Sequence, residues 1–200
     1  MSSSSSANKI HPLWLRCCHW INAVAIAGMI FSGWRIYNAS PLFDFSFPAQ
    51  LTLGGWLGGA LQWHFAMMWL LVINAAVYLT LGIVSGRFRR KFFPLSFRQL
   101  RVDLSQALRG KLQHTDLGHY NTVQKLAYLG AIFLGIGLVL SGLVLWKSVQ
   151  FPLLRTLLGG YDAARYIHFF CMSGMALFVV IHLVMVLLVP RTLLAMLRGR

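Results

Sequence analysis

The 200-residue chain is poor in charged residues and above all in acidic ones. Only 11% of its residues are charged, and four are acidic against 18 that are basic. Apolar residues make up 58% of the chain, and its mean hydropathy is +0.66. These values lie outside the range of soluble globular domains and indicate an integral membrane protein.

The chain also lacks the cysteine motifs of metal and covalent haem sites. Its three cysteines, Cys17, Cys18 and Cys171, form neither a C-x-x-C nor a C-x-x-C-H pattern. This excludes a zinc ribbon and covalent attachment of a c-type haem. Adjacent cysteines cannot easily bridge each other, so we interpret all three as small buried apolar residues.

Four apolar segments dominate the chain, each near or above the roughly 20 residues that a helix needs to cross a bilayer. They lie at about 14–37, 61–84, 123–146 and 163–189. We predict an all-α, integral membrane four-helix bundle in one domain, 13–200, after a disordered polar tail at 1–12. Residues 102–108 are compatible with a short interfacial amphipathic helix. No internal repeat at a fixed period is evident.

The basic residues lie between the spans and predict the topology. With four spans both termini lie on one side, and 14 of the 18 Lys and Arg residues fall on that side. The other side has Arg35, Lys147, Arg155 and Arg165. The positive-inside rule therefore puts both termini in the cytoplasm, in a multi-pass protein of a bacterial inner membrane. Topology explains the net charge of +14. The aromatic residues lie in the spans and not on a basic face, which argues against a nucleic-acid partner.

Four histidines lie within the predicted spans, where polar groups are costly and mark function. His168 and His182 are fourteen residues apart on one helix, hence on nearly the same face and about 21 Å apart along its axis. The topology puts His19 and His182 at the cytoplasmic depth, and His64 and His168 at the periplasmic depth. Each pair comes from two helices, as bis-histidine ligation of a b-type haem requires. We predict two haem b groups with these iron ligands.

Other interpretations of the histidines remain open. A single histidine in a membrane helix can hydrogen-bond a neighbouring carbonyl. Zinc or copper is disfavoured because Asp44, Asp103, Asp116 and Asp162 all fall in loops or at helix ends. The remaining histidines lie in polar cytoplasmic stretches, and we interpret them as solvated: His11, His114 and His119.

Several short motifs together resemble a known family. They are His19-Trp20-x-Asn22, Gly33-Trp34-x-Ile36-Tyr37, Gln62-Trp63-His64-Phe65, Tyr120-Asn121-x-x-Gln124-Lys125 and the His168/His182 pair. The chain resembles the four-helix di-haem cytochrome b subunits of the cytochrome b561 superfamily. These include formate dehydrogenase gamma, the b-type subunit of Ni-Fe hydrogenase and the thiosulfate-reductase-type membrane anchor.

The resemblance implies the same ligand pairs, His19 with His182 and His64 with His168. It also implies a site for a quinone, ubiquinone or menaquinone, beside the cytoplasmic-side haem, lined by Asn121 with Gln124 and Lys125 as neighbours. These side chains could bind a quinone carbonyl or a haem propionate. Asn121 also fits a simple helix cap. Members of the thiosulfate-reductase-type branch often accompany a periplasmic molybdopterin protein.

Three functions follow as hypotheses. The first is a di-haem cytochrome b, the electron-transfer subunit of an oxidoreductase, linking the quinone pool to a periplasmic redox partner such as a molybdopterin subunit. The second is a self-contained superoxide:quinone oxidoreductase of the same fold. The third is a haem-free membrane anchor or transporter. Membrane lipid is a partner in all three, and oligomers are compatible with each.

Overall fold

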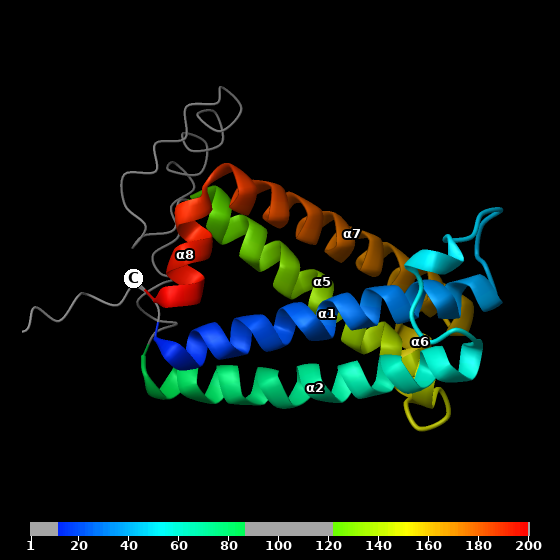
Figure 1. Cartoon of the computed structure of the whole chain (residues 1–200). Helices are drawn as coiled ribbons and strands as arrows, with labels where there is room; N and C mark the ends of the chain where they lie inside the picture. Colours follow the sequence, from blue (N-terminus) through cyan, green and yellow to red (C-terminus); the bar gives the residue numbers. More distant parts are fainter. Residues whose placement is uncertain (1–11, 87–121, 200) are drawn as a thin grey trace, which may run out of the picture. The chain divides into compact units, whose positions relative to one another are not determined.

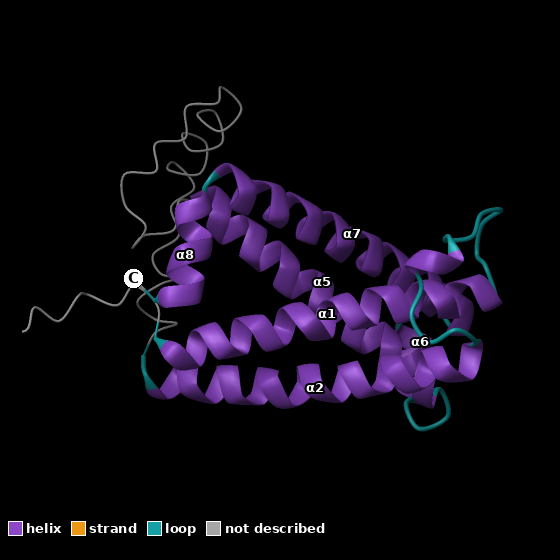
Figure 2. Cartoon of the chain, viewed as in Figure 1, coloured by secondary structure: helices purple, strands orange, loops and turns teal. Residues whose placement is uncertain are grey.

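The computed structural model describes residues 12–86 and 122–199, with backbone only at 122–125. Within these ranges the regular structure is helical, and no strand occurs (Figure 2). The predictions for the polar tail up to residue 11, for residues 102–108, for Asn121 and for the three solvated histidines lie outside the described residues.

Four long helices account for most of the described chain (Figure 1). They are α1 (Leu13–Ala39), α2 (Leu57–Val84), α5 (Thr122–Lys147) and α7 (Tyr161–Leu188). Each is long and apolar enough to cross a membrane, and helices satisfy their backbone groups internally, as a bilayer demands. The predicted all-α, four-span architecture is confirmed, and the chain is a multi-pass membrane protein. The cytoplasmic location of the termini stays a prediction.

Glycines and prolines determine where the helices begin and end. Gly54 and Gly55 have φ values of +107° and +70°, which L side chains rarely adopt, and they turn the chain into α2 at Leu57. A 3-10 turn, η1 (Ala49–Leu51), precedes them. Between α5 and α7 a short helix, α6 (Pro152–Leu157), begins at its proline.

Pro190 ends the fourth span and begins another helix. α7 ends at Leu188, and α8 (Pro190–Arg198) follows with Pro190 in its first turn. Proline is tolerated at this position because its missing N–H would have no helical partner there. The short helix α8 was not predicted from the sequence.

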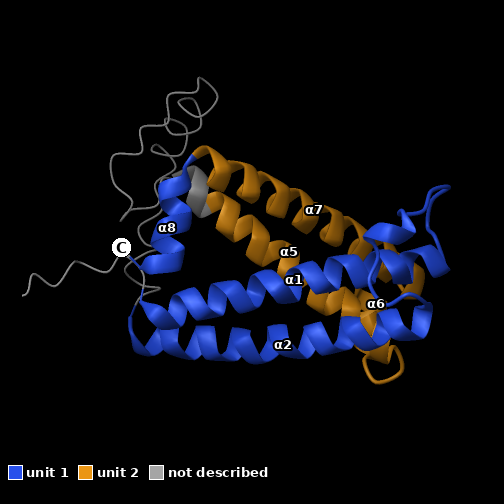
Figure 3. Cartoon of the chain, viewed as in Figure 1, with its two compact units in different colours: residues 1–91, 189–200 blue, residues 92–188 orange. Residues whose placement is uncertain are grey.

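The chain forms two compact units (Figure 3). Unit 1 comprises residues 1–91 and 189–200, and its described part holds α1, η1, α2 and α8. Unit 2 comprises residues 92–188, and its described part holds α5, α6 and α7. In unit 1 the long helices α1 and α2 pack against each other, and in unit 2 α5 packs against α7.

Small residues let the paired helices approach closely. A Cβ at Gly28 of α1 would lie 2.6 Å from Met67 Cγ of α2, and one at Gly137 of α5 would lie 2.7 Å from Cys171 Sγ of α7. These distances are below van der Waals contact, so only glycine fits without a shift of its neighbour. Such close approach is typical of helix packing in membranes.

Candidate functional site

The predicted periplasmic-side histidines, here called the outer histidines, are His64 and His168. His64 lies on α2, seven residues after the helix begins at Leu57, and its ring contacts α1. Its Nδ1 is 3.0 Å from Oγ of Ser32, whose side chain is fully buried. A Cβ at Gly33 would lie 3.7 Å from Cε1 of His64. The imidazole therefore lies against a hydroxyl and a bare stretch of backbone on α1.

His168 has the same surroundings in unit 2. It lies on α7, seven residues after the helix begins at Tyr161. Its Nδ1 is 3.0 Å from Oγ of Ser141 on α5, and this serine is also fully buried. A Cβ at Gly142 would lie 3.4 Å from Cε1 of His168. Each unit thus has one histidine bonded to a serine on the neighbouring helix, with a glycine directly after that serine.

Sequence reasoning missed these two serines. Both lie in a Gly-x-x-x-Ser-Gly segment, at 28–33 in α1 and at 137–142 in α5. Both outer histidines are followed by phenylalanine, Phe65 and Phe169. The serine-to-histidine separation is 32 residues in one unit and 27 in the other. A search at a fixed period misses the pair because these two separations differ.

The predicted cytoplasmic-side histidines, here called the inner histidines, are His19 and His182. His19 lies six residues after α1 begins, and His182 lies six residues before α7 ends, or about 9 Å from each helix end. The His19 ring contacts the Trp20 ring edge-on, with centroids 5.5 Å apart. The His182 ring stacks on Phe178 at 6.2 Å. Both therefore lie among aromatic rings, within a helix long enough to span a membrane.

Asn74 of α2 is a further polar residue that sequence reasoning missed. It is buried, and its Nδ2 donates to the Cys18 carbonyl at 2.8 Å and to Asn22 Oδ1 at 2.6 Å. Cys18 precedes His19, and Asn22 follows it by three residues on α1. Asn74 thus clamps the segment of α1 that carries an inner histidine. An asparagine inside an apolar span was the available signal.

Each unit contributes one inner and one outer histidine. Unit 1 carries His19 and His64, and unit 2 carries His182 and His168. The predicted pairs each join the two units, so the pairing stays a prediction. In the described part of the chain no group of three or more His, Cys, Asp or Glu side chains could hold a metal ion. A haem iron needs only two axial ligands from protein.

The predicted quinone residues lie at the edge of the described chain. Asn121 is outside it, and Gln124 and Lys125 fall in the first turn of α5, where only the backbone is described. Their predicted role is therefore not tested by the structure.

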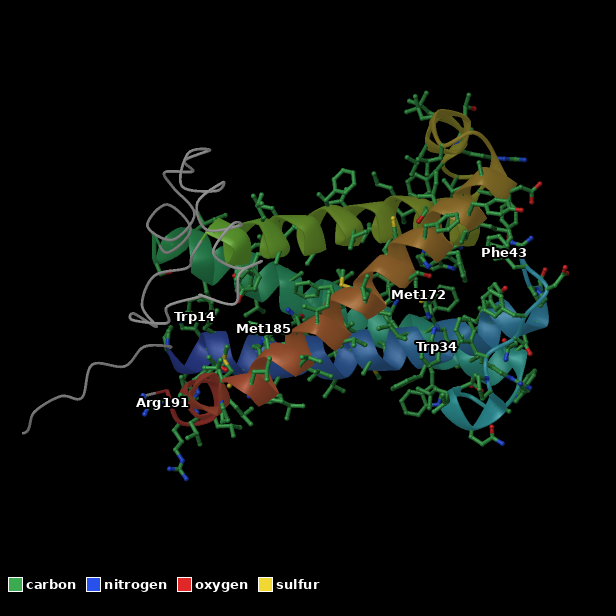
Figure 4. The ribbon with its side chains drawn as sticks, turned by 90° about the horizontal axis from the view of Figure 1, so that it is seen from above. Trp14, Trp34, Phe43, Met172, Met185 and Arg191 are labelled. Atoms are coloured by element: carbon green, nitrogen blue, oxygen red, sulfur yellow. The ribbon has the colours of Figure 1, made fainter. Side chains whose placement is uncertain are left out.

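The loop between α1 and η1 folds back on the end of α1. Asn38 donates from Nδ2 to the Phe47 carbonyl and accepts at Oδ1 from the Phe47 N–H, both at 2.8 Å. Phe47 stacks on Trp34, with centroids 4.7 Å apart and planes 8° from parallel. The loop therefore packs across the end of α1. Within unit 1, Trp34 and Phe43 lie at one end and Trp14 and Arg191 at the other (Figure 4).

At the other end of unit 1, hydrogen bonds join α1 to α8. Nε of Arg16 on α1 donates to the Met196 carbonyl of α8 at 2.9 Å, and its Nη2 donates to the Leu197 carbonyl. A guanidinium at a helix C-terminus satisfies carbonyls that lack helical partners, and it complements the helix dipole. Arg16 therefore fixes α8 beside the start of α1.

Comparison with known proteins gives two matches. The family model described as prokaryotic cytochrome b561 matches residues 10–199. A protein of Azospira oryzae, named "Putative protein-methionine-sulfoxide reductase subunit YedZ1", is 62% identical over 190 residues, which cover 95% of this chain and 96% of the relative. No solved structure matches the chain significantly.

Proposed function

The chain belongs to the prokaryotic cytochrome b561 family, a family of membrane haem proteins, and from this premise we propose a specific role for it. It is a di-haem b-type cytochrome of the bacterial inner membrane, with both termini in the cytoplasm. It transfers electrons between the quinone pool and a periplasmic redox partner. The proposal treats residues 13–200 as one functional domain.

The observation that carries the proposal is the distribution of the four span histidines. In unit 1, His19 lies six residues after α1 begins and His64 lies seven residues after α2 begins. In unit 2, His168 lies seven residues after α7 begins and His182 lies six residues before it ends. Neutral imidazoles of this kind suit the axial positions of b-type haem iron. We assign His19 and His182 to one haem, and His64 and His168 to the other.

The residues around these ligands fit a haem. The imidazole rings contact serine hydroxyls or aromatic rings, and none of these groups adds a charge that a macrocycle would have to bury. A bound haem supplies a one-electron couple at its iron. The chain itself supplies the imidazoles, fixes their orientation and holds them within apolar helices.

We place the quinone site at the start of α5. Asn121, with Gln124 and Lys125, would bind the carbonyl of ubiquinone or menaquinone through its amide. Oxidation of a quinol releases two electrons and two protons. The inner ligands would then belong to the haem nearer this site.

The name of the Azospira relative suggests the acceptor. We propose that this chain is the membrane subunit of a protein-methionine-sulfoxide reductase, with a periplasmic molybdopterin subunit as partner. Reduction of one sulfoxide to a thioether consumes two electrons and two protons and releases one water. One quinol therefore supplies the electrons for one methionine.

Haem content and quinol-driven reduction test this function. The purified full chain should show a Soret band and two haems in a pyridine haemochrome assay, and a quinol analogue should reduce both. Asn121→Ala should slow this reduction while both haems stay bound. A chain without a Soret band would overturn the proposal in favour of a haem-free anchor. Turnover of superoxide without any partner would instead favour the superoxide:quinone oxidoreductase.

A further inference from the structure

The proton of the Ser32 hydroxyl has a definite place. Oγ of Ser32 is 2.6 Å from the Gly28 carbonyl oxygen, one turn back on α1. Two oxygens this close need a proton between them, so the hydroxyl donates to the carbonyl. A hydroxyl has only one proton to donate. Toward His64 Nδ1, at 3.0 Å, the Ser32 oxygen must therefore accept.

The same argument about the hydroxyl proton applies to Ser141 in unit 2. Oγ of Ser141 is 2.5 Å from the Gly137 carbonyl oxygen, so its proton is used there. At 3.0 Å from His168 Nδ1 this oxygen also accepts. Both outer histidines therefore carry their proton on Nδ1. In a neutral imidazole the lone pair is then on Nε2, which is the nitrogen left to bind a metal.

We propose that Ser32 and Ser141 are positioning residues for the outer haem, an inference that rests on the proposed function. Each serine holds its histidine in the Nδ1–H tautomer and presents Nε2 to the iron. A histidine that ligates a metal through one nitrogen usually donates from the other, and this second bond fixes both tautomer and ring orientation. Here the acceptor is a hydroxyl anchored on its own helix.

A glycine beside each serine leaves room for the histidine ring. Gly33 and Gly142 directly follow the two serines, and a Cβ at either would lie 3.7 or 3.4 Å from Cε1 of the histidine. Cε1 lies between the two ring nitrogens. The serine hydroxyl therefore holds the ring at Nδ1, and the missing side chain of the glycine leaves the space beside Cε1 free for the ring.

Loss of the hydroxyl should weaken haem binding and raise the haem potential. Mutation of such supporting partners typically costs about 10- to 100-fold in metal affinity. Donation from Nδ1–H makes the imidazole more basic, and a more basic ligand favours the ferric state. If the variant weakens ferric binding tenfold more than ferrous binding, the potential rises by about 59 mV.

The experiment compares Ser32→Ala and Ser141→Ala with the unchanged chain, purified in detergent with its haems. We expect one haem to become easier to lose and to shift to higher potential in a redox titration, while the other keeps its potential. Low-temperature EPR should show a changed low-spin ferric signal for that haem only. Ser32→Thr and Ser141→Thr retain a hydroxyl and should restore the potential.

Thr156→Val is the matched control. The Thr156 hydroxyl donates to the Pro152 carbonyl one turn back in α6, as the two serines do, but on an exposed surface. Its removal should leave both haems unchanged. Circular dichroism checks that every variant keeps its helices. Should an alanine variant fail to fold, Ser→Cys at the same position keeps the volume with a weaker acceptor and should give an intermediate shift.

The outcomes separate the two proposals. Absence of haem from the unchanged chain overturns the proposed function. Two haems in the unchanged chain, with potentials and EPR signals that stay the same in both alanine variants, overturn the role of the serines alone. Equal shifts of both haems would also overturn it, because the serines contact only the outer histidines among those described.

Discussion

Asn74 should contribute measurably to the packing of α1 on α2. Asn74→Leu keeps the number and branching of the side-chain heavy atoms and removes both hydrogen bonds, to the Cys18 carbonyl and to Asn22 Oδ1. Side-chain hydrogen bonds between membrane helices contribute about 0.6 kcal/mol each on average and at most about 1.7. For two bonds from one buried amide we expect a loss of about 1 kcal/mol, with an upper limit of about 3.

A double-mutant cycle separates the two bonds. Asn22→Ala, Asn74→Ala and the double variant are unfolded reversibly in mixed detergent micelles and followed by circular dichroism. The coupling energy between the two side chains should be about 0.6 kcal/mol. The remaining loss in Asn74→Ala then belongs to the Cys18 carbonyl bond and to the lost side-chain packing.

A coupling energy of zero between Asn22 and Asn74 would refute the proposed hydrogen-bond contribution. So would an Asn74→Leu variant as stable as the unchanged chain, because it would mean that the buried amide contributes nothing to helix association. Asn38→Ala serves as a control for the cycle. Asn38 also makes two hydrogen bonds, but to the backbone of Phe47 in the loop, so it should show no coupling with Asn74.

Three further outcomes are expected. His64→Ala or His168→Ala should lower the haem content from two to one per chain in a pyridine haemochrome assay, and a variant that keeps two would contradict the ligand assignment. Gly142→Ala should keep both haems, since its Cβ would lie 3.4 Å from His168 Cε1. Gly142→Leu should displace the ring and lose the outer haem. Asn38→Ala should lower the free energy of local unfolding of the loop by about 1–3 kcal/mol. Amide hydrogen exchange at Phe47 and its neighbours should then be faster, and unchanged exchange would contradict this prediction.

The four spans could be predicted because membrane helices must be long and apolar, and a long apolar segment is recognised directly from the hydropathy of the sequence. The ends of the spans were predicted less exactly. α2 begins at Leu57, four residues before the predicted start at 61, because its first turn is as apolar as the loop before it. The positive φ angles of Gly54 and Gly55 and the extended backbone of Trp56 distinguish the turn from the helix.

The partners of the site residues could not be predicted in the same way. Which face of α1 meets α2 depends on side-chain packing, and Ser32 becomes a partner of His64 only when that face is known. A serine in an apolar helix has an adequate alternative in its own backbone, through the carbonyl one turn back. The pattern alone therefore gave no reason to connect it with a histidine.

The two outer histidine sites show why the repeat is recognisable in space but not along the chain. The serine-to-histidine separation is 32 residues in unit 1 and 27 in unit 2. It includes the connection between the two helices, which is four residues longer in unit 1, and Ser32 also lies one residue farther from the end of its helix than Ser141 does. The helical geometry compensates for the difference, because each histidine lies seven residues after its helix begins. Depth within the helix, and not distance along the sequence, is therefore the quantity that the two units share.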